Sequence, residues 1–174
     1  CLEKDQILFK KVQAALKTNN IKLMDIELVR IKEDLVTDYR KAFECGAELG
    51  ATDVLSSVWT DDKNFAIEQY GKICETAREF GLTINLEFPI ISGLKNLQEV
   101  LEIQEKVDAP NLKILMDMLY VYWAGVNSKE IKEINPQKFG LLHMCDCPKQ
   151  EENRAKVEIM RGDREYCGQG LINL

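Results

Sequence analysis

The regular spacing of three strand-length apolar runs is the feature that most limits how this chain can fold. The runs end in three residues that can bind a metal, namely Glu87, Asp117 and His143. The stretches between the runs are long enough for a helix, which gives the β-α-β-α rhythm of a parallel sheet. Because parallel strands all end on the same face of a sheet, we expect these three side chains to lie close together. That C-terminal rim is where α/β barrels and open α/β sheets place their active sites.

The same interval continues towards the N-terminus. Glu27, Ser57, Glu87 and Asp117 are spaced by 30 residues, and His143 follows after 26. A period of this size is one β-α unit, and consecutive units of one kind indicate either a barrel or a doubly wound sheet. No glycine-rich phosphate loop follows the first predicted strand, which favours the barrel.

Hydrophobic periodicity and end signals predict the individual elements. Strands are expected at residues 21–31, 54–59, 82–87, 112–117 and 139–143. Helices are expected at residues 2–17, 34–49, from the cap at 60–62 to about 80, 97–107 and 128–134. Gly50 and Gly81 are expected to end the second and third helices. Residues 149–154 are expected to form a solvated loop.

The length of the chain is short for the barrel that its period predicts. An eightfold barrel takes about 250 residues, whereas this chain has 174. We therefore expect residues 1–174 to be a single TIM barrel domain that is incomplete at both ends. The alternative is a complete, smaller α/β sheet of five strands.

Composition excludes several classes of partner. The net charge is −6 and the basic residues are scattered, so a nucleic-acid partner is not expected. No run approaches the roughly 18 apolar residues that span a bilayer, so we expect a soluble, cytoplasmic protein. The six cysteines are expected to be reduced thiols because the chain is large enough to form a core. Association into a homo-oligomer is compatible with a barrel.

Each candidate metal ligand also has a structural interpretation. A carboxylate at a strand end commonly caps the next helix, so Glu87 or Asp117 alone would be weak evidence. His143, the only histidine, could instead be a core residue. Cys145 and Cys147 alternate with His143, but thiolate zinc sites usually separate their ligands by two to four residues. A zinc site at these cysteines is therefore the weaker interpretation.

Four segments resemble successive motifs of the xylose isomerase-like barrel superfamily, the sugar phosphate isomerases and epimerases. They read Leu-Glu-Phe-Pro at 86–89, Asn-Leu-Lys-Ile-Leu-Met-Asp at 111–117, His-Met-Cys-Asp-Cys-Pro at 143–148 and Arg-Glu-Tyr-Cys-Gly-Gln-Gly-Leu-Ile at 164–172. The resemblance implies about strands three to seven of a (β/α)8 TIM barrel. It also implies a divalent metal ion, Mn, Mg, Co or Zn, held by Glu87, Asp117 and His143. A fourth ligand, a glutamate, would lie beyond Leu174.

The resemblance suggests substrate contacts as well, with some departures from the family pattern. Tyr120 stands where family members often have a histidine, three residues after the strand-six aspartate. Arg164 matches a family arginine that would face an anionic or polyhydroxy substrate, while Cys167 and Gln169 replace two usual residues in the following turn. Trp59 is a further candidate, either for substrate contact or for packing at the mouth of the barrel.

The function that these residues imply is a metal-dependent sugar isomerase or epimerase. Glu87 would remove the proton next to a carbonyl of a small ketose, polyol or related keto compound, giving an enediolate. An inosose or dehydroshikimate-type dehydratase and a noncatalytic, barrel-derived sugar-binding or scaffolding protein are the alternatives. A DNA-repair endonuclease of the same superfamily is disfavoured, because it needs several histidines and a basic face.

Overall fold

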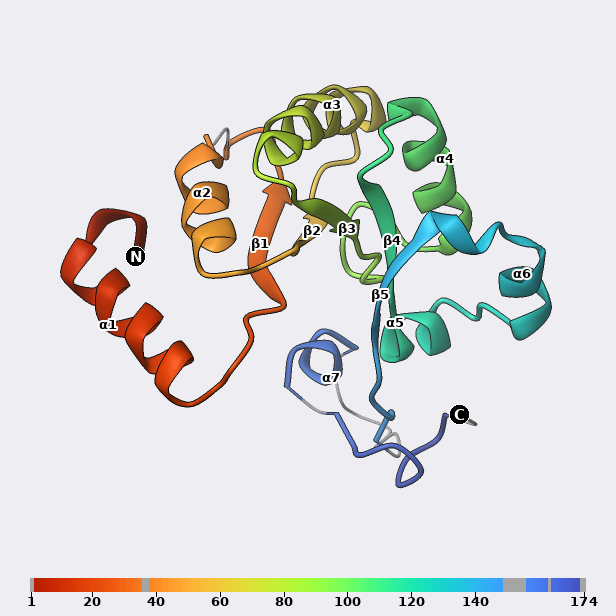
Figure 1. Ribbon diagram of the computed structural model, residues 1–174. Helices are drawn as coiled ribbons and strands as arrows, with labels where there is room; N and C mark the ends of the chain where they lie inside the picture. The colour runs from red at the N-terminus through yellow and green to blue at the C-terminus, as the bar shows by residue number, and fades with distance from the viewer. Residues whose placement is uncertain (1, 36–37, 149–155, 163, 173–174) are drawn as a thin grey trace.

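The computed structural model describes residues 2–35, 38–148, 156–162 and 164–172, and it contains one parallel sheet. The strands are β1 (Asp25–Ile31), β2 (Asp53–Val58), β3 (Thr83–Leu86), β4 (Leu112–Asp117) and β5 (Phe139–His143). Each strand pairs with the next one along the chain, in the order β1-β2-β3-β4-β5 (Figure 1). A doubly wound sheet would reverse its strand order. The unidirectional order is that of a barrel.

Helices follow the strands in the alternating pattern that the sequence predicts. They are α1 (Gln6–Thr18), α2 (Arg40–Glu48), α3 (Lys63–Glu79), α4 (Leu97–Val107), α5 (Met118–Trp123), α6 (Ser128–Glu133) and α7 (Lys156–Gly162), with short 3-10 turns at η1 (Leu2–Lys4) and η2 (Pro136–Lys138). In Figure 1, α2, α3 and α4 lie along the upper side of the sheet and α7 lies below it. No helix in the described residues is long and apolar enough to cross a bilayer.

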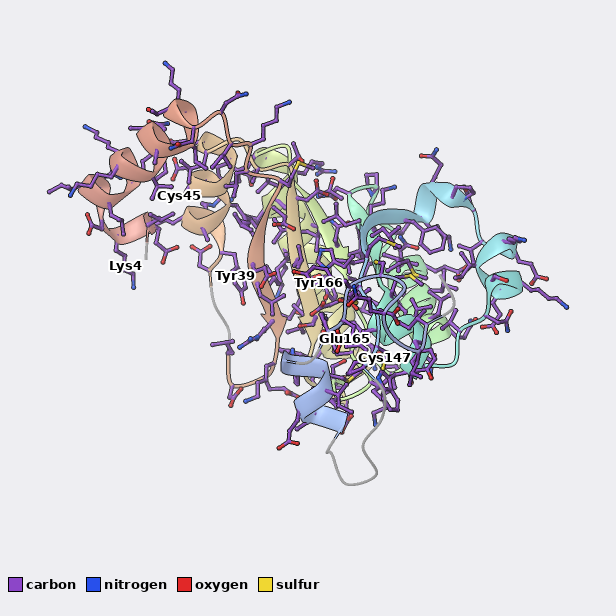
Figure 2. All side chains as sticks on the ribbon, turned by 90° about the horizontal axis from the view of Figure 1, so that it is seen from below. Lys4, Tyr39, Cys45, Cys147, Glu165 and Tyr166 are labelled. Carbon is purple, nitrogen blue, oxygen red and sulfur yellow. The ribbon has the colours of Figure 1, made fainter. Side chains whose placement is uncertain are left out.

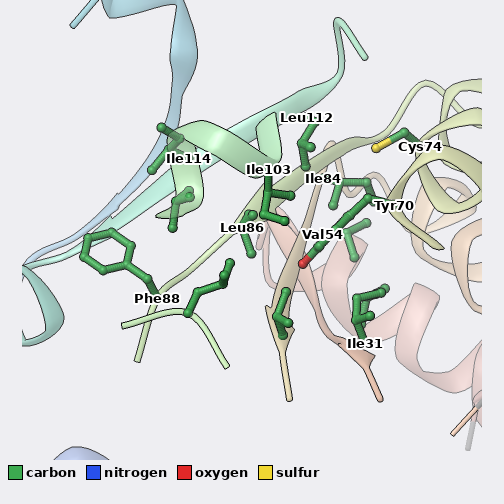
Figure 3. Packing of buried hydrophobic residues seen from close by; sticks show 14 of the residues in the cluster. Ile31, Val54, Tyr70, Cys74, Ile84, Leu86, Phe88, Ile103, Leu112 and Ile114 are labelled. Atoms are coloured by element: carbon green, nitrogen blue, oxygen red, sulfur yellow. The ribbon is translucent and has the colours of Figure 1, made fainter. Parts of the chain in front are cut away.

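The main core lies between the sheet and the helices α2, α3 and α4 (Figure 3). Its largest member is Tyr70 of α3, which is fully buried. A buried hydroxyl needs a partner, and that of Tyr70 donates to Ser56 Oγ at 3.1 Å. Ser56 Oγ in turn donates to the Asn85 carbonyl at 3.0 Å. Alternating residues of β1 to β4 fill this layer, so the intervening residues face the opposite, concave side.

Most predicted boundaries lie within a few residues of the observed ones. Asp62 caps α3 as predicted, accepting from the Phe65 N–H at 3.0 Å. The first strand was predicted too long, because Ile21 and Met24 are exposed and β1 starts only at Asp25. The prediction also started the second helix too early, since α2 begins at Arg40. The helices α5 and α7 were not predicted, and residues 149–154 lie outside the described residues.

Candidate active site

Two of the predicted metal ligands meet at the C-terminal ends of neighbouring strands. Asp117 ends β4, His143 ends β5, and the two residues are paired in register. His143 Nδ1 lies 3.9 Å from Asp117 Oδ2. The convergence predicted from the strand ends is therefore confirmed for this pair.

The two oxygens of Asp117 face different partners. Oδ1 accepts from the Leu119 N–H at 3.0 Å and thereby caps α5, and it also accepts from the Cys145 thiol at 3.6 Å. Oδ2 accepts from the Arg164 guanidinium at 2.8 Å. The side chain is almost fully buried, with 3% exposed. Asp117 is thus a helix cap on one side and an ionic partner on the other.

Glu87 follows β3 directly and sits in a strongly perturbed electrostatic environment. Burial raises the pKa of its carboxyl from 4.5 to about 7, with further contributions from the carboxylates of Asp117 and Glu27. The guanidinium groups of Arg164 and Arg30 act on this pKa in the opposite direction but do not cancel the increase. A carboxyl with a pKa near neutrality can both accept and release a proton, which is the property of a general base or acid.

A cavity of about 810 Å³ joins these residues to the other predicted site residues. Its charged and polar lining comprises Glu27, Arg30, Lys32, Trp59, Glu87, Asp117, Tyr120, His143 and Arg164. All six residues predicted for catalysis, metal binding or substrate contact are in this set. The volume fits a small metabolite, since small-molecule sites usually measure about 300–1,000 Å³.

Tyr120 and Arg164 form one wall of the cavity. The guanidinium carbon of Arg164 lies 5.5 Å from the centroid of the Tyr120 ring, within the range of a cation–π contact. Burial raises the pKa of Tyr120 to about 12, together with the charges of Glu87 and Asp117. The phenol is therefore neutral at physiological pH, and it is suited to donating a hydrogen bond rather than to transferring a proton.

Trp59 follows β2 directly and lines the cavity. Its indole Nε1–H donates to Ser57 Oγ at 2.8 Å, which restricts the orientation of the ring. The Trp59 N–H also bonds to the Ile31 carbonyl at 2.7 Å. These contacts present a rigid aromatic surface to the cavity.

Asp146 supports the site and was not identified from the sequence. Its fully buried carboxylate accepts from four backbone N–H groups, those of Cys147, Gly168, Gly170 and Ile172, at 2.8–3.0 Å. Burial alone would raise the pKa of Asp146, but these N–H groups outweigh it and lower the pKa below its usual value. In the sequence, Asp146 is marked only by its position between Cys145 and Cys147.

The Asp146 anchor holds the segment that carries Arg164. The backbones of Asp146 and Glu165 exchange two hydrogen bonds, at 2.9 and 3.0 Å, in an isolated antiparallel bridge. Figure 2 labels Cys147 and Glu165, which lie on the two segments that the bridge joins. A Cβ on Gly170 would lie 2.1 Å from the Cys147 carbonyl oxygen, so the turn requires glycine there. Arg164 immediately precedes the bridge, and its approach to Asp117 depends on it.

Asp146→Asn is expected to loosen the turn that follows Arg164. An amide retains one accepting oxygen, but its NH₂ group faces N–H donors that it cannot bind. Amide hydrogen exchange across residues 164–172 should become at least about tenfold faster, because charge-assisted bonds are lost. Exposed Asp61→Asn is the matched control. Unchanged exchange in Asp146→Asn would show that the carboxylate does not hold this segment.

The donor set fits a divalent metal ion, although the side chains do not form a ready-made cluster. Within the described ranges, no group of three or more His, Cys, Asp or Glu side chains is placed to hold a metal. Glu87, Asp117 and His143 nevertheless line one cavity and supply two carboxylates and an imidazole, a set that suits Mn, Mg, Co or Zn. The carboxylate of Asp117 also contributes to the raised pKa of Glu87, and a cation would relieve this repulsion.

Comparison with known proteins places the architecture in a family of barrels. A family model described as "Xylose isomerase-like TIM barrel" matches residues 2–174. A xylose isomerase-like TIM barrel/4-hydroxyphenylpyruvate dioxygenase fusion protein is similar over 95% of this chain and 28% of its own, with 20% identity and a TM-score of 0.81. No curated protein matches the sequence.

Two further solved structures share the fold. A zinc-binding IolI protein is 19% identical, with a TM-score of 0.78 over 95% of this chain and 64% of its own. The 3-keto-D-glucoside 4-epimerase YcjR from E. coli is 15% identical, with a TM-score of 0.70 over 91% of this chain and 74% of its own. The chain thus spans less than two thirds of the fusion protein and of the IolI protein. At these identities the likeness establishes the fold.

Proposed function

Because the chain belongs to the xylose isomerase-like TIM barrel family, we propose that it carries the active site of a metal-dependent sugar isomerase or epimerase. The superfamily includes epimerases and dehydratases among its solved members. The proposed substrate is a small ketose, polyol or related keto compound. The reaction is the transfer of a proton next to a carbonyl.

The observation that carries this proposal is the environment of Glu87. Its carboxyl has a pKa raised to about 7, and it shares a cavity with the adjacent pair Asp117 and His143. A base is most effective when its pKa lies near the working pH. A carboxylate tuned in this way beside further metal-binding groups suits proton abstraction from a weakly acidic carbon.

Glu87, Asp117 and His143 are the residues that would hold the metal ion. A divalent ion at this position would act as a Lewis acid on the substrate carbonyl and fix the orientation of a neighbouring hydroxyl. Glu87 would take the proton from the carbon while the electron pair moves to the carbonyl oxygen. Return of the proton by Glu87 to the neighbouring carbon, with transfer of the hydroxyl proton to the former carbonyl oxygen, gives isomerisation. Epimerisation instead needs a second acid that protonates the original carbon from the opposite face.

The remaining wall residues would bind and orient the substrate. Because its pKa is raised to about 12, the Tyr120 hydroxyl stays protonated near neutral pH and can donate a hydrogen bond. Arg164 offers guanidinium N–H groups beyond the one that contacts Asp117 Oδ2. Trp59 supplies an aromatic surface on which the apolar face of a sugar can pack.

A noncatalytic sugar-binding protein is the second candidate, and one contact favours it. Arg164 already neutralises Asp117 Oδ2, the oxygen that faces His143. An arginine that stays in this position would reduce the affinity of the site for a cation. A protein with this property would bind a sugar in the cavity without exchanging its protons.

The proposed function is tested by metal binding and by proton exchange. We expect calorimetric titration with Mn²⁺ to give about one ion per chain. We also expect the Mn²⁺-loaded protein to exchange the proton next to the carbonyl of one member of a ketose panel with deuterium from solvent, observed by NMR. Binding of Mn²⁺ and a ketose without exchange would support the noncatalytic candidate. Absence of Mn²⁺ binding would contradict the proposed enzyme.

A further inference from the structure

We propose that Arg30 forms an oxyanion subsite at the far end of the cavity, so that the substrate is a small polyol or keto compound carrying a carboxylate or phosphate group. This inference rests on the proposed function, because it adds a substrate class to the same cavity. Arg30 lies on β1, the strand furthest from His143 in the sheet order. It was not among the residues predicted to contact substrate.

The strand register directs the Arg30 side chain into the cavity. Val29 and Ile31 are 1% and 2% exposed and belong to the core on the helix side of the sheet. Successive side chains of a strand point to opposite faces, so Arg30 points to the concave side. Arg30 lines the cavity accordingly. Its charge acts on Glu87 as well, which shows that the two groups share one electrostatic environment.

Arg30 and Glu87 lie in the same row across the sheet. Arg30 is paired with Ser57 of β2. Ser56 is paired with Leu86 of β3, so the next position along brings Ser57 opposite Glu87. Two strand spacings separate Arg30 from Glu87, which amounts to roughly 10 Å between backbones. A substrate of about six carbons whose reacting carbon is at Glu87 would place its other end near Arg30.

In the part of the chain that the structure describes, the exposed side chain of Arg30 has no ion pair, while its backbone is held by a neighbouring tyrosine. The Tyr39 hydroxyl accepts from the backbone N–H of Arg30 at 3.2 Å and donates weakly to the backbone carbonyl of Arg30 at 3.5 Å. These two bonds fix the backbone at Arg30. Among the described cations that line the cavity, Lys32 pairs with Asp34 and Arg164 with Asp117, while Arg30 has no ion pair. A guanidinium is planar and binds carboxylate or phosphate through two parallel hydrogen bonds. An anionic group of the substrate would complete this arrangement.

The test compares D-gluconate with D-glucitol, two six-carbon polyols that differ only in a terminal carboxylate. Binding is measured by calorimetry with and without Mn²⁺, because without metal the carboxylate cannot gain affinity by chelation. We expect gluconate to bind at least about tenfold more tightly than glucitol in both conditions. Arg30→Gln should remove this preference while leaving the affinity for glucitol unchanged. Arg30→Lys should restore part of it.

Controls separate the subsite from general charge effects and from the proposed function. Lys72→Gln removes an exposed cation on α3 and should leave the preference intact. Tighter binding of D-glucitol 6-phosphate than of gluconate would identify a phosphate ester as the anionic group. If the parent protein does not bind Mn²⁺ but shows an Arg30-dependent preference for gluconate, the proposed enzyme is contradicted and the proposed subsite is supported. Equal affinities for gluconate and glucitol, absence of binding by either, or an unaffected Arg30→Gln protein would overturn the subsite.

Discussion

Glu87→Gln is expected to stabilise the metal-free protein at about pH 8 and to lower turnover by about 10²–10⁴-fold. The loss of turnover follows from removing the proposed base while retaining the size of the side chain. The gain in stability follows from the environment of the carboxyl, because burial and two neighbouring carboxylates penalise its charge. Glutamine fills the same space without a charge.

The effect on stability depends on pH in a defined direction. The pKa of Glu87 rises from 4.5 to about 7 on folding, so the folded protein retains a proton that the unfolded chain has lost. The parent should therefore lose stability relative to Glu87→Gln as the pH rises from about 4.5 to about 7, with no further loss above that range. Above pH 7, the shift lowers the free energy of unfolding of the parent relative to Glu87→Gln by about 3 kcal/mol. At pH 5 the difference is about 1 kcal/mol or less.

Urea unfolding in the presence of a chelator, at about pH 5 and pH 8, measures this difference. Glu105→Gln on α4 is the control, since Glu105 is exposed and lies outside the cavity. Adding Mn²⁺ should stabilise the parent at pH 8 and the Glu87→Gln variant much less, because binding to the folded state shifts the equilibrium. Equal stability of parent and variant at both pH values would mean that Glu87 ionises without cost and is not tuned for proton transfer.

The architecture was predictable because its main signal is local. Strand-length apolar runs and the helices between them each leave a pattern within about 20 residues, and their repetition implies parallel strands. The boundaries of β1 and α2 were less predictable. Residues 21–24 are as apolar as a strand, yet Ile21 and Met24 are exposed and the register of β1 with β2 starts only at Asp25. Pairing of this kind depends on the rest of the fold.

The site was predictable only where chain position determines spatial position. Asp117 and His143 end adjacent parallel strands, which brings them to the same end of the sheet, and they are paired in register. The 30-residue interval was less informative for Glu27. Paired residues of β1 and β2 are offset by 28 positions at Asp25 and Asp53 and by 27 after the irregularity between Ile26 and Val29, so Arg30 rather than Glu27 lies opposite Ser57. An irregularity within a strand changes the register without changing the residue count.

The contacts of Arg164 and Asp146 could not have been predicted from spacing. Arg164 reaches Asp117 across 47 positions of the chain, and it does so because Asp146 holds the turn that follows it. A buried carboxylate that binds backbone N–H groups leaves no periodic pattern in the sequence. The family resemblance identified Arg164 as a candidate, whereas its supporting residue emerged only from the hydrogen bonds.

Asp117→Asn is expected to lower the affinity for Mn²⁺ by at least about 100-fold with little change in the fold. Loss of a residue that only supports a ligand costs about 10–100-fold in metal affinity, so loss of a charged ligand should cost at least as much. Asparagine retains an oxygen that can cap α5 through the Leu119 N–H. Asp117→Ala would lose the cap as well, at a further cost of about 1 kcal/mol in stability.

Comparison with Arg164→Gln separates the ionic partner from the metal ligand. If Arg164 and Mn²⁺ compete for Asp117 Oδ2, Arg164→Gln should bind Mn²⁺ about tenfold more tightly than the parent, since the competing charge-assisted bond is removed. Asp117→Asn should bind it weakly whether or not Arg164 is present. Calorimetric titrations of the two single variants and the double variant give these affinities. Parent-like Mn²⁺ affinity in Asp117→Asn would place the metal elsewhere in the cavity and remove Asp117 from the proposed site.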